Sequence, residues 1–166
     1  DGMRQLADFV QRMMVEPQTK AGKLGTSSAS STARSGRAIG VIGIPGDRRD
    51  EDQREYGAIA ATAFDEIIVR EDKNLRGRAV GETATNVIDG VRSVKGGTGV
   101  RVGRADKVLE EKEAVRTALR RAIPGDLVVC CVDDAIGVYR EAMAAAGASR
   151  GGQAFADPGE LEVPEG

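Results

Sequence analysis

Apolar residues recur along the chain in two patterns, one typical of helices and the other typical of buried strands. In residues 1–15 the apolar side chains fall on one stripe at helical spacing, which predicts an amphipathic helix. Short continuous apolar runs predict buried strands at 38–43, 66–70 and 127–132. The run at 127–132 is the most apolar of the three. Helical spacing predicts further helices at 51–64, 80–91, 110–123 and 135–146.

This alternation of strands and helices predicts the fold class. Continuous apolar strands joined by crossover helices are typical of a parallel sheet that is covered on both faces. We therefore expect an α/β fold, a three-layer α/β/α Rossmann-like domain with a mostly parallel sheet, spanning residues 1–148. Two weaker strand candidates are Val100–Val102 and Lys107–Leu109.

Two segments lack either pattern. Residues 17–36 are rich in Ser, Thr, Ala and Gly, which predicts a flexible loop inside the domain. Residues 149–166 are rich in Gly, Pro and Glu, which predicts a disordered tail. The last helix is expected to be capped by Asp134 and to stop at Gly147.

Composition excludes several classes of function. The charges nearly balance, with 24 basic and 26 acidic residues, and Trp is absent, so nucleic acid is not an expected partner. No apolar run approaches the roughly 20 residues of a membrane helix, and the start does not resemble a signal peptide. We expect no membrane association and a cytoplasmic location.

The cysteines and the absence of histidine restrict the chemistry. The adjacent Cys130 and Cys131 point to opposite faces of a strand, so we expect two small apolar side chains rather than a disulfide. Without histidine the chain has no His-based triad, and two cysteines alone make no standard zinc site. No nucleophile stands out and no phosphate-binding loop motif is present, so we expect no catalytic residue and no metal ligand in this chain.

Charged loops follow the predicted strands, where open parallel sheets bind ligands. Arginine can grip a carboxylate or a phosphate, and Asp and Glu can hold an ammonium or a guanidinium group, so this rim suits a zwitterion. The substrate-binding candidates are Asp47, Arg48, Arg49, Asp50, Glu51, Glu71, Asp72 and Arg76. The third loop, Asp133 and Asp134, is expected on the same rim, chiefly as a strand end and helix cap. Surface charge without a ligand is the alternative, with Arg70 and Arg78 simply pairing with Glu71 and Asp72.

Two charged motifs carry a resemblance to a known family. The segments 42–52 (IGIPGDRRDED) and 67–72 (IIVRED), the latter continued by Leu75–Arg78 (LRGR), resemble the C-terminal domain of the Mur ligase family. Within it they are most similar to the cyanophycin synthetases. The likeness extends over about residues 1–143, and 124–129 (PGDLVV) resembles the entry to a late strand of that domain.

The resemblance implies a function. Mur ligases use ATP and Mg²⁺ to convert a carboxylate into an acyl phosphate, which the amine of an incoming amino acid attacks to form an amide. Cyanophycin synthetases add arginine to aspartate side chains in this way. Arginine, or another amino acid, is therefore the implied ligand, with carboxylates around its guanidinium and Arg48, Arg49 or Arg76 on its carboxylate or on the acyl phosphate.

The resemblance also implies partner domains. The central ATPase domain and the N-terminal ATP-grasp module are not found in these 166 residues, and ATP and Mg²⁺ are expected to bind mainly there. We therefore expect no ligation by this chain alone. The alternatives are a stand-alone amino-acid-binding module without catalysis and a domain of another Mur-like ligase. The sequence does not determine the oligomeric state.

Overall fold

The computed structural model describes residues 2–15 and 36–150, which contain five helices and four strands. In chain order these are α1 (Gly2–Val15), β1 (Ala38–Ile42), α2 (Asp50–Ala63), β2 (Glu66–Val69), α3 (Glu82–Val94), β3 (Arg104–Lys107), α4 (Glu111–Arg121), β4 (Leu127–Cys130) and α5 (Ala135–Arg150). The chain divides into two compact units, Asp1–Cys131 and Val132–Gly166, and α5 belongs to the second. Among the described residues, no helix is both long and apolar enough to span a bilayer.

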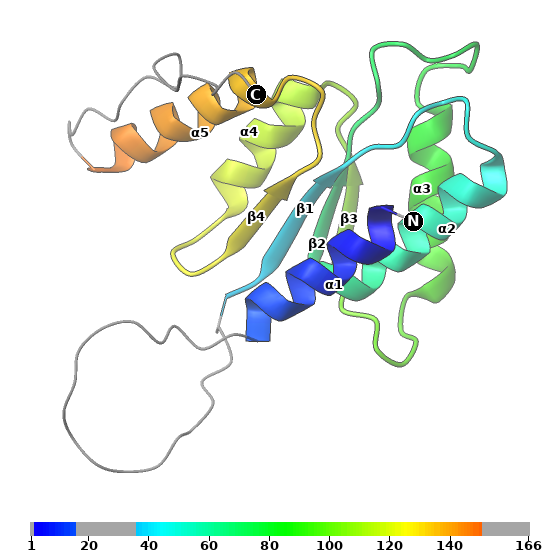
Figure 1. Ribbon diagram of the computed structural model, residues 1–166, viewed down its shortest axis with the longest axis horizontal. Coiled ribbons are helices and arrows are strands. Elements are labelled where there is room, and N and C mark those ends of the chain that lie inside the picture. The colour runs from blue at the N-terminus through cyan, green and yellow to red at the C-terminus, as the bar shows by residue number, and fades with distance from the viewer. Residues whose placement is uncertain (1, 16–35, 151–166) are drawn as a thin grey trace, which may run out of the picture. The chain divides into compact units, whose positions relative to one another are not determined.

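The four strands of the first unit form one parallel sheet in the order β3-β2-β1-β4 (Figure 1). The chain adds β2 and β3 on one side of β1 and then returns to place β4 on the other side. The predicted three-layer α/β/α, Rossmann-like architecture is confirmed, with α1, α2 and α3 on one face and α4 on the other (Figure 1). The prediction of one domain over residues 1–148 stays a prediction.

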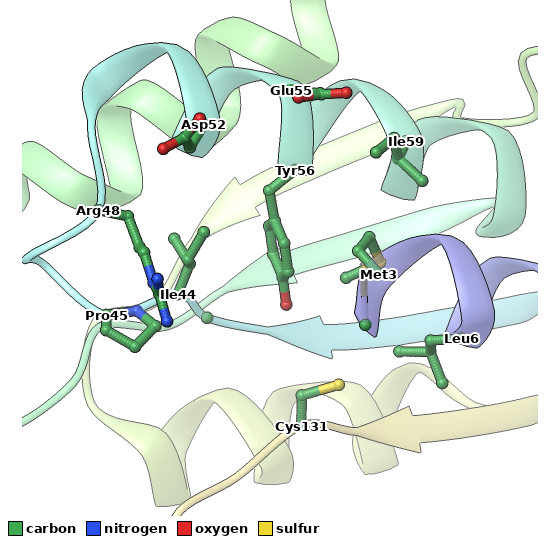
Figure 2. Close-up of a pocket in the computed structure, with 12 residues that line it drawn as sticks. Met3, Leu6, Ile44, Pro45, Arg48, Asp52, Glu55, Tyr56, Ile59 and Cys131 are labelled. Atoms are coloured by element: carbon green, nitrogen blue, oxygen red, sulfur yellow. The ribbon is translucent and has the colours of Figure 1, made fainter.

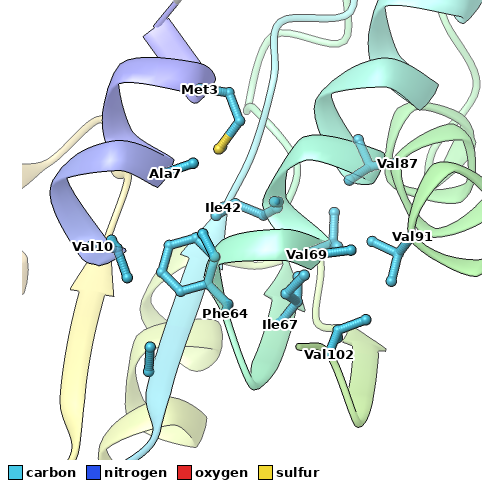
Figure 3. Close-up of a cluster of buried hydrophobic side chains, with 14 of the residues drawn as sticks. Met3, Ala7, Val10, Ile42, Phe64, Ile67, Val69, Val87, Val91 and Val102 are labelled. Carbon is cyan, nitrogen blue, oxygen red and sulfur yellow. The ribbon is translucent and has the colours of Figure 1, made fainter. Parts of the chain in front are cut away.

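Alternation along the central strands explains why both faces are covered. In β1, Ala38 and Ile42 join the apolar core beneath α1, α2 and α3 (Figure 3). The intervening Ile39 and Val41 are also fully buried and point to the other face, where α4 packs. A strand buried on both faces reads as a continuous apolar run, which is why β1 and β2 are visible in the sequence.

The core on the first face combines one helix stripe with one aromatic ring. Met3, Ala7 and Val10 of α1 are buried at helical spacing (Figure 3). The predicted stripe is confirmed at Met3 and Val10, whereas Phe9, also expected on it, is 47% exposed. The ring of Phe64 is fully buried over β1, and a Cβ atom at Gly40 would lie 2.9 Å from its carbons. Gly40 therefore leaves the room that the ring fills.

Helices α2 and α3 pack at a pair of glycines. A Cβ atom at Gly57 would lie 2.1 Å from the carbonyl oxygen of Val87, and one at Gly90 would lie 1.9 Å from that of Arg54. Atoms cannot approach this closely, so the two backbones meet only because both positions lack a side chain.

A network of ion pairs lies near the N-terminal ends of the strands, opposite the C-terminal ends from which the charged loops leave. Its members are Arg37, Glu66, Arg104, Asp106, Arg121 and Asp126. The buried carboxylate of Glu66 lies 2.5 Å from a guanidinium nitrogen of Arg121. Asp126, whose side chain is 1% exposed, accepts from both the backbone and the guanidinium of Arg37, at 2.8 Å each. The network ties α4 and the turn before β4 to the starts of the other strands.

Three details differ from the sequence prediction. The third strand is Arg104–Lys107, which overlaps the second predicted candidate only at Lys107. Three of its four side chains are polar and none is buried, which hides it, whereas Val102 is buried without belonging to a strand. β4 lies at a sheet edge and is half-buried rather than fully buried, because only β1 pairs with it. The last helix runs through Gly147 to Arg150, beyond the predicted stop.

Other boundaries agree or lie outside the described residues. Asp134 caps α5 as predicted, since its carboxylate accepts from the N–H of Gly137 at 2.9 Å. The predicted loop 17–36 lies almost entirely outside the described residues, as does the predicted tail from 151 onward.

The glycine contact predicts a stability effect. Gly57→Ala and Gly90→Ala are each expected to lower the free energy of unfolding by about 1–3 kcal/mol, because the added methyl forces the helices apart. Gly147→Ala is the control: a Cβ atom there meets nothing within 4 Å, so helix propensity alone acts and the change is neutral or stabilising. Urea unfolding of the three variants decides; equal stability in all of them contradicts the contact.

Asp126 predicts a dependence of stability on pH. Burial opposes ionisation of its carboxylate, yet the hydrogen bonds from Arg37 and Ile123 outweigh burial and hold its pKa below the ordinary 3.8. Its ionised form therefore adds stability above pH 3.8, and this contribution is lost as the pH falls below that value. Asp126→Asn is expected to be less stable than the original chain at pH 7 in urea unfolding. The difference should shrink at pH 3; a constant difference contradicts the assignment.

Candidate functional site

The C-terminal ends of β1, β2 and β4 lie side by side at one edge of the sheet (Figure 1). The strand order reverses next to β1, since β2 and β4 flank it on opposite sides. Such a reversal is where open α/β sheets bind their ligands. The candidate site is therefore built on the residues that follow these strands.

Arg70 joins the three strand ends. Its side chain is 5% exposed, and its Nε donates to the carbonyl oxygen of Cys131, just after β4, at 3.1 Å. Its Nη1 lies 2.6 Å from Asp72 and 3.5 Å from Glu111, so the buried charge is compensated. A Cβ atom at Gly43 would lie 2.8 Å from the Arg70 Nε. The glycine after β1 therefore makes room for this guanidinium.

The two predicted charged loops meet, as expected for loops that follow neighbouring strands. Asp47 of the first loop lies 3.3 Å from Arg76 of the second, and Asp50 lies 2.7 Å from Arg78. A Cβ atom at Gly46 would lie 2.5 Å from the carbonyl oxygen of Leu75, so the two backbones also touch. The third predicted loop, Asp133 and Asp134, belongs to the second unit.

Most predicted site residues are engaged with other residues of the chain. Arg49 forms a two-point pair with Asp52 at 2.8 and 3.0 Å, and Asp72 pairs with Arg70. Glu71 is 8% exposed, and one of its oxygens accepts from the N–H of Gly81 at 2.7 Å. Glu51 is exposed in the first turn of α2. The alternative in which Arg78 pairs with Glu71 or Asp72 is wrong, because Arg78 binds Asp50 and Glu82 instead.

Among the predicted arginines of the site, Arg48 is the exception. Its side chain is exposed, and among residues 2–15 and 36–150 its guanidinium has no ion-pair or hydrogen-bond partner. Its backbone is nevertheless fixed: its N–H donates to the Pro45 carbonyl at 3.3 Å. A guanidinium with five donors and no protein acceptor is available to an anionic ligand.

A cavity of about 570 Å³ opens beside Arg48 (Figure 2). It lies between the first turns of α1, the segment after β1, helix α2 and the end of β4. Its walls are mostly apolar with a charged rim, formed by Gly2, Met3, Leu6, Gly43, Ile44, Pro45, Arg48, Asp52, Glu55, Tyr56, Ile59 and Cys131. Among the predicted site residues, the described part of the chain brings Arg48 alone to this cavity.

Tyr56 reaches into the cavity from α2 (Figure 2). Burial raises the pKa of its phenol well above the ordinary 10.0, and the nearby Arg70 opposes this only in part. The phenol is therefore neutral at physiological pH and supplies a hydroxyl that can donate or accept. Asp52 and Glu55 on the rim are already paired with Arg49 and Arg4, so they add no uncompensated negative charge.

The residues in the described part of the chain do not fit a nucleotide with its metal. They hold no cluster of three or more His, Cys, Asp or Glu side chains able to bind a metal ion. The N-terminus of α2 carries Asp50, Glu51 and Asp52. Asp50 and Asp52 are paired with Arg78 and Arg49, and the exposed Glu51 disfavours a phosphate at this helix end. No reaction step through ATP or Mg²⁺ is derived from these residues.

The predicted site residues are all charged, and they do not include the apolar residues that form the cavity walls. Ile44 and Pro45 follow Gly43 just after β1, but they are uncharged and complete no phosphate-binding loop motif, so they are not among the predicted site residues. Tyr56 lies within the predicted helix 51–64, where helical spacing indicates packing rather than binding. The available signal was position, since residues just after a central parallel strand line the ligand crevice regardless of their charge.

Sequence comparisons show which proteins this chain resembles. The sequence profile described as "Mur ligase, glutamate ligase domain" matches residues 22–132. Proteins named cyanophycin synthetase are similar to the chain: that of Crocosphaera subtropica is 46% identical over 96 residues, and that of Synechocystis sp. is 44% identical over 94. Each match covers 57% of this chain and 10% of the relative, so the chain matches about a tenth of their length.

The burial of the two cysteines predicts that the folded chain is alkylated slowly. Both are free, and burial raises the pKa of Cys130 from 9.0 to about 11 and also raises that of Cys131. At pH 8 Cys130 of the folded protein is expected to react with iodoacetamide at about one hundredth of the rate of an ordinary thiol, and Cys131 more slowly than an ordinary thiol, because the thiolate is the reactive form. In urea the rate should return to the ordinary value. Fast alkylation of the folded chain, read by mass spectrometry, would contradict this.

Proposed function

This chain belongs to the Mur ligase family, and from that premise we propose that its first unit binds the incoming amino acid of an ATP-dependent, amide-forming ligase. The family forms amides from a carboxylate and an amine, so a member needs a site that holds an amino acid by its carboxylate and leaves its amine free. The cavity at the strand ends has the chemistry of such a site.

The observation that carries the proposal is the guanidinium of Arg48 on the cavity rim, which has no ion-pair or hydrogen-bond partner among the described residues. The fork of an arginine binds a carboxylate through two parallel hydrogen bonds, which fixes both position and orientation. Ile44, Pro45 and Ile59 offer apolar walls to an aliphatic side chain, and the Tyr56 hydroxyl offers one neutral polar contact. An amino acid with a long aliphatic stem matches this combination.

Arginine is the amino acid that we propose, on the similarity to cyanophycin synthetases. The aspartates on the rim do not by themselves select arginine. Asp47, Asp50 and Asp72 are each paired with an arginine of the chain, so they do not offer free carboxylates to a ligand guanidinium. Two predicted carboxylates have no ion pair in the described part: Glu51, exposed on α2, and Glu71, which is buried and accepts from the N–H of Gly81. The proposal therefore rests on the carboxylate end of the ligand.

We assign the ATP- and Mg²⁺-dependent activation of the acceptor carboxylate to other parts of a larger ligase in the cytoplasm. The sequence contains no phosphate-binding loop motif, and the described residues hold no cluster of three or more side chains able to bind a metal ion. Phosphoryl transfer requires positioned phosphates and a metal. The chain by itself is expected to bind the amino acid without forming amide or releasing ADP.

The test is calorimetric titration of the chain with arginine, with lysine and with Mg-ATP. Arginine is expected to bind, and Arg48→Gln is expected to weaken it at least about tenfold, because a charged two-point contact is lost. Arg92→Gln is the matched control, an exposed arginine on α3 that pairs only loosely with Asp89 at 3.7 Å. Unchanged affinity in Arg48→Gln, or equal loss in both variants, would sink the assignment of Arg48.

A further inference from the structure

Arg78 connects the second charged loop to the backbone of the first. Its Nε donates to the carbonyl oxygen of Gly46 at 2.6 Å, and its Nη2 donates to that of Arg48 at 2.8 Å, thirty residues away in the chain. The same Nη2 lies 2.7 Å from Asp50, and Nη1 lies 2.6 Å from Glu82. An ordinary surface ion pair involves carboxylates alone, whereas this guanidinium, 17% exposed, gives two bonds to main-chain oxygens.

The Arg48 carbonyl is held from a second direction. Gln53 of α2 is fully buried, and its amide nitrogen donates to the Arg48 oxygen at 3.2 Å. The amide oxygen of Gln53 in turn accepts from Asn86 of α3 at 2.8 Å. Two helices and the second loop thus fix the main chain of Arg48, while its side chain remains without a partner in the described part.

We propose that Arg78 is a positioning residue: it holds the backbone of Arg48 so that the unpaired guanidinium is presented to the cavity. This rests on the proposed function, in which Arg48 grips the amino acid's carboxylate. A ligand-binding side chain gains affinity when its main chain is already fixed, because less freedom is lost on binding. Arg78 itself contacts no ligand, since its donors are engaged with Gly46, Arg48, Asp50 and Glu82.

Lysine cannot replace this residue. Its single ammonium group lacks the planar fork that reaches several acceptors at fixed angles. Arg78→Lys therefore keeps the charge of the loop and removes the geometry. Arg92→Lys makes the same substitution at an exposed position of α3 and is the matched control.

The first measurement is amide hydrogen exchange, which needs no ligand. In Arg78→Lys the amides of Arg48 and Gln53, bonded to the Pro45 and Arg49 carbonyls, are expected to exchange at least about tenfold faster. The amide of Arg70, bonded to Ile42 in the sheet, should be unchanged, which shows that the fold is intact. Unchanged exchange in the first loop overturns the proposal. If Arg78→Lys does not fold, Gln53→Met removes the other donor and must accelerate the same amides.

The second measurement is a double-mutant cycle on arginine binding, followed by NMR titration at high arginine concentration. Arg78→Lys is expected to weaken binding about tenfold in the original chain and to have no further effect in the Arg48→Gln background. Additive losses would mean that Arg78 touches the ligand directly, which overturns the positioning role. If the original chain binds no arginine, the proposed function fails, and the exchange measurement alone still decides whether Arg78 fixes the loop.

Discussion

The guanidinium of Arg70, buried between the ends of three parallel strands, is the contact on which the candidate site depends. A buried charge is costly unless it is compensated, and Asp72 and Glu111 compensate this one while the carbonyl of Cys131 takes a third bond. Gly43 is required beside it because any larger residue would occupy the place of the guanidinium. The strand ends are therefore fixed relative to one another, and the segments that leave them start from fixed positions.

Charged residues have different roles at the N-terminal and the C-terminal ends of the strands. At the starts of the strands, acids and arginines form a closed network in which Glu66 and Asp126 are buried, and its contribution is to stability. At the strand ends the pairing is incomplete. Asp72, Asp47 and Asp50 are paired with Arg70, Arg76 and Arg78, whereas Arg48 has no partner among the described residues and lies at the mouth of an apolar cavity. The guanidinium of Arg48 gives this edge the capacity to bind an anion.

Family membership and local geometry answer different questions. The match to the Mur ligase family identifies the kind of domain, and it covers most of the first unit. It does not identify the contacts of an individual side chain. Those follow from the neighbours: Arg48 and Arg49 are adjacent in sequence, yet Arg49 is bound to Asp52 and Arg48 is not bound within the described residues. The proposed amino-acid contact is therefore assigned to Arg48.

The sequence by itself determined the order of the elements, the burial of the central strands and the loops that carry charge, because these depend on local periodicity. β1 and β2 were visible as apolar runs, whereas β3 was misplaced, since an edge strand with exposed polar side chains lacks that signal. Only the tertiary structure decided which charges are neutralised. Arg78 meets Asp50, and Arg76 meets Asp47, across 28 and 29 positions of the chain, and such pairings depend on how the strands are ordered rather than on nearby residues. The cavity likewise required α1 to pack beside the end of β1, which no local pattern specifies.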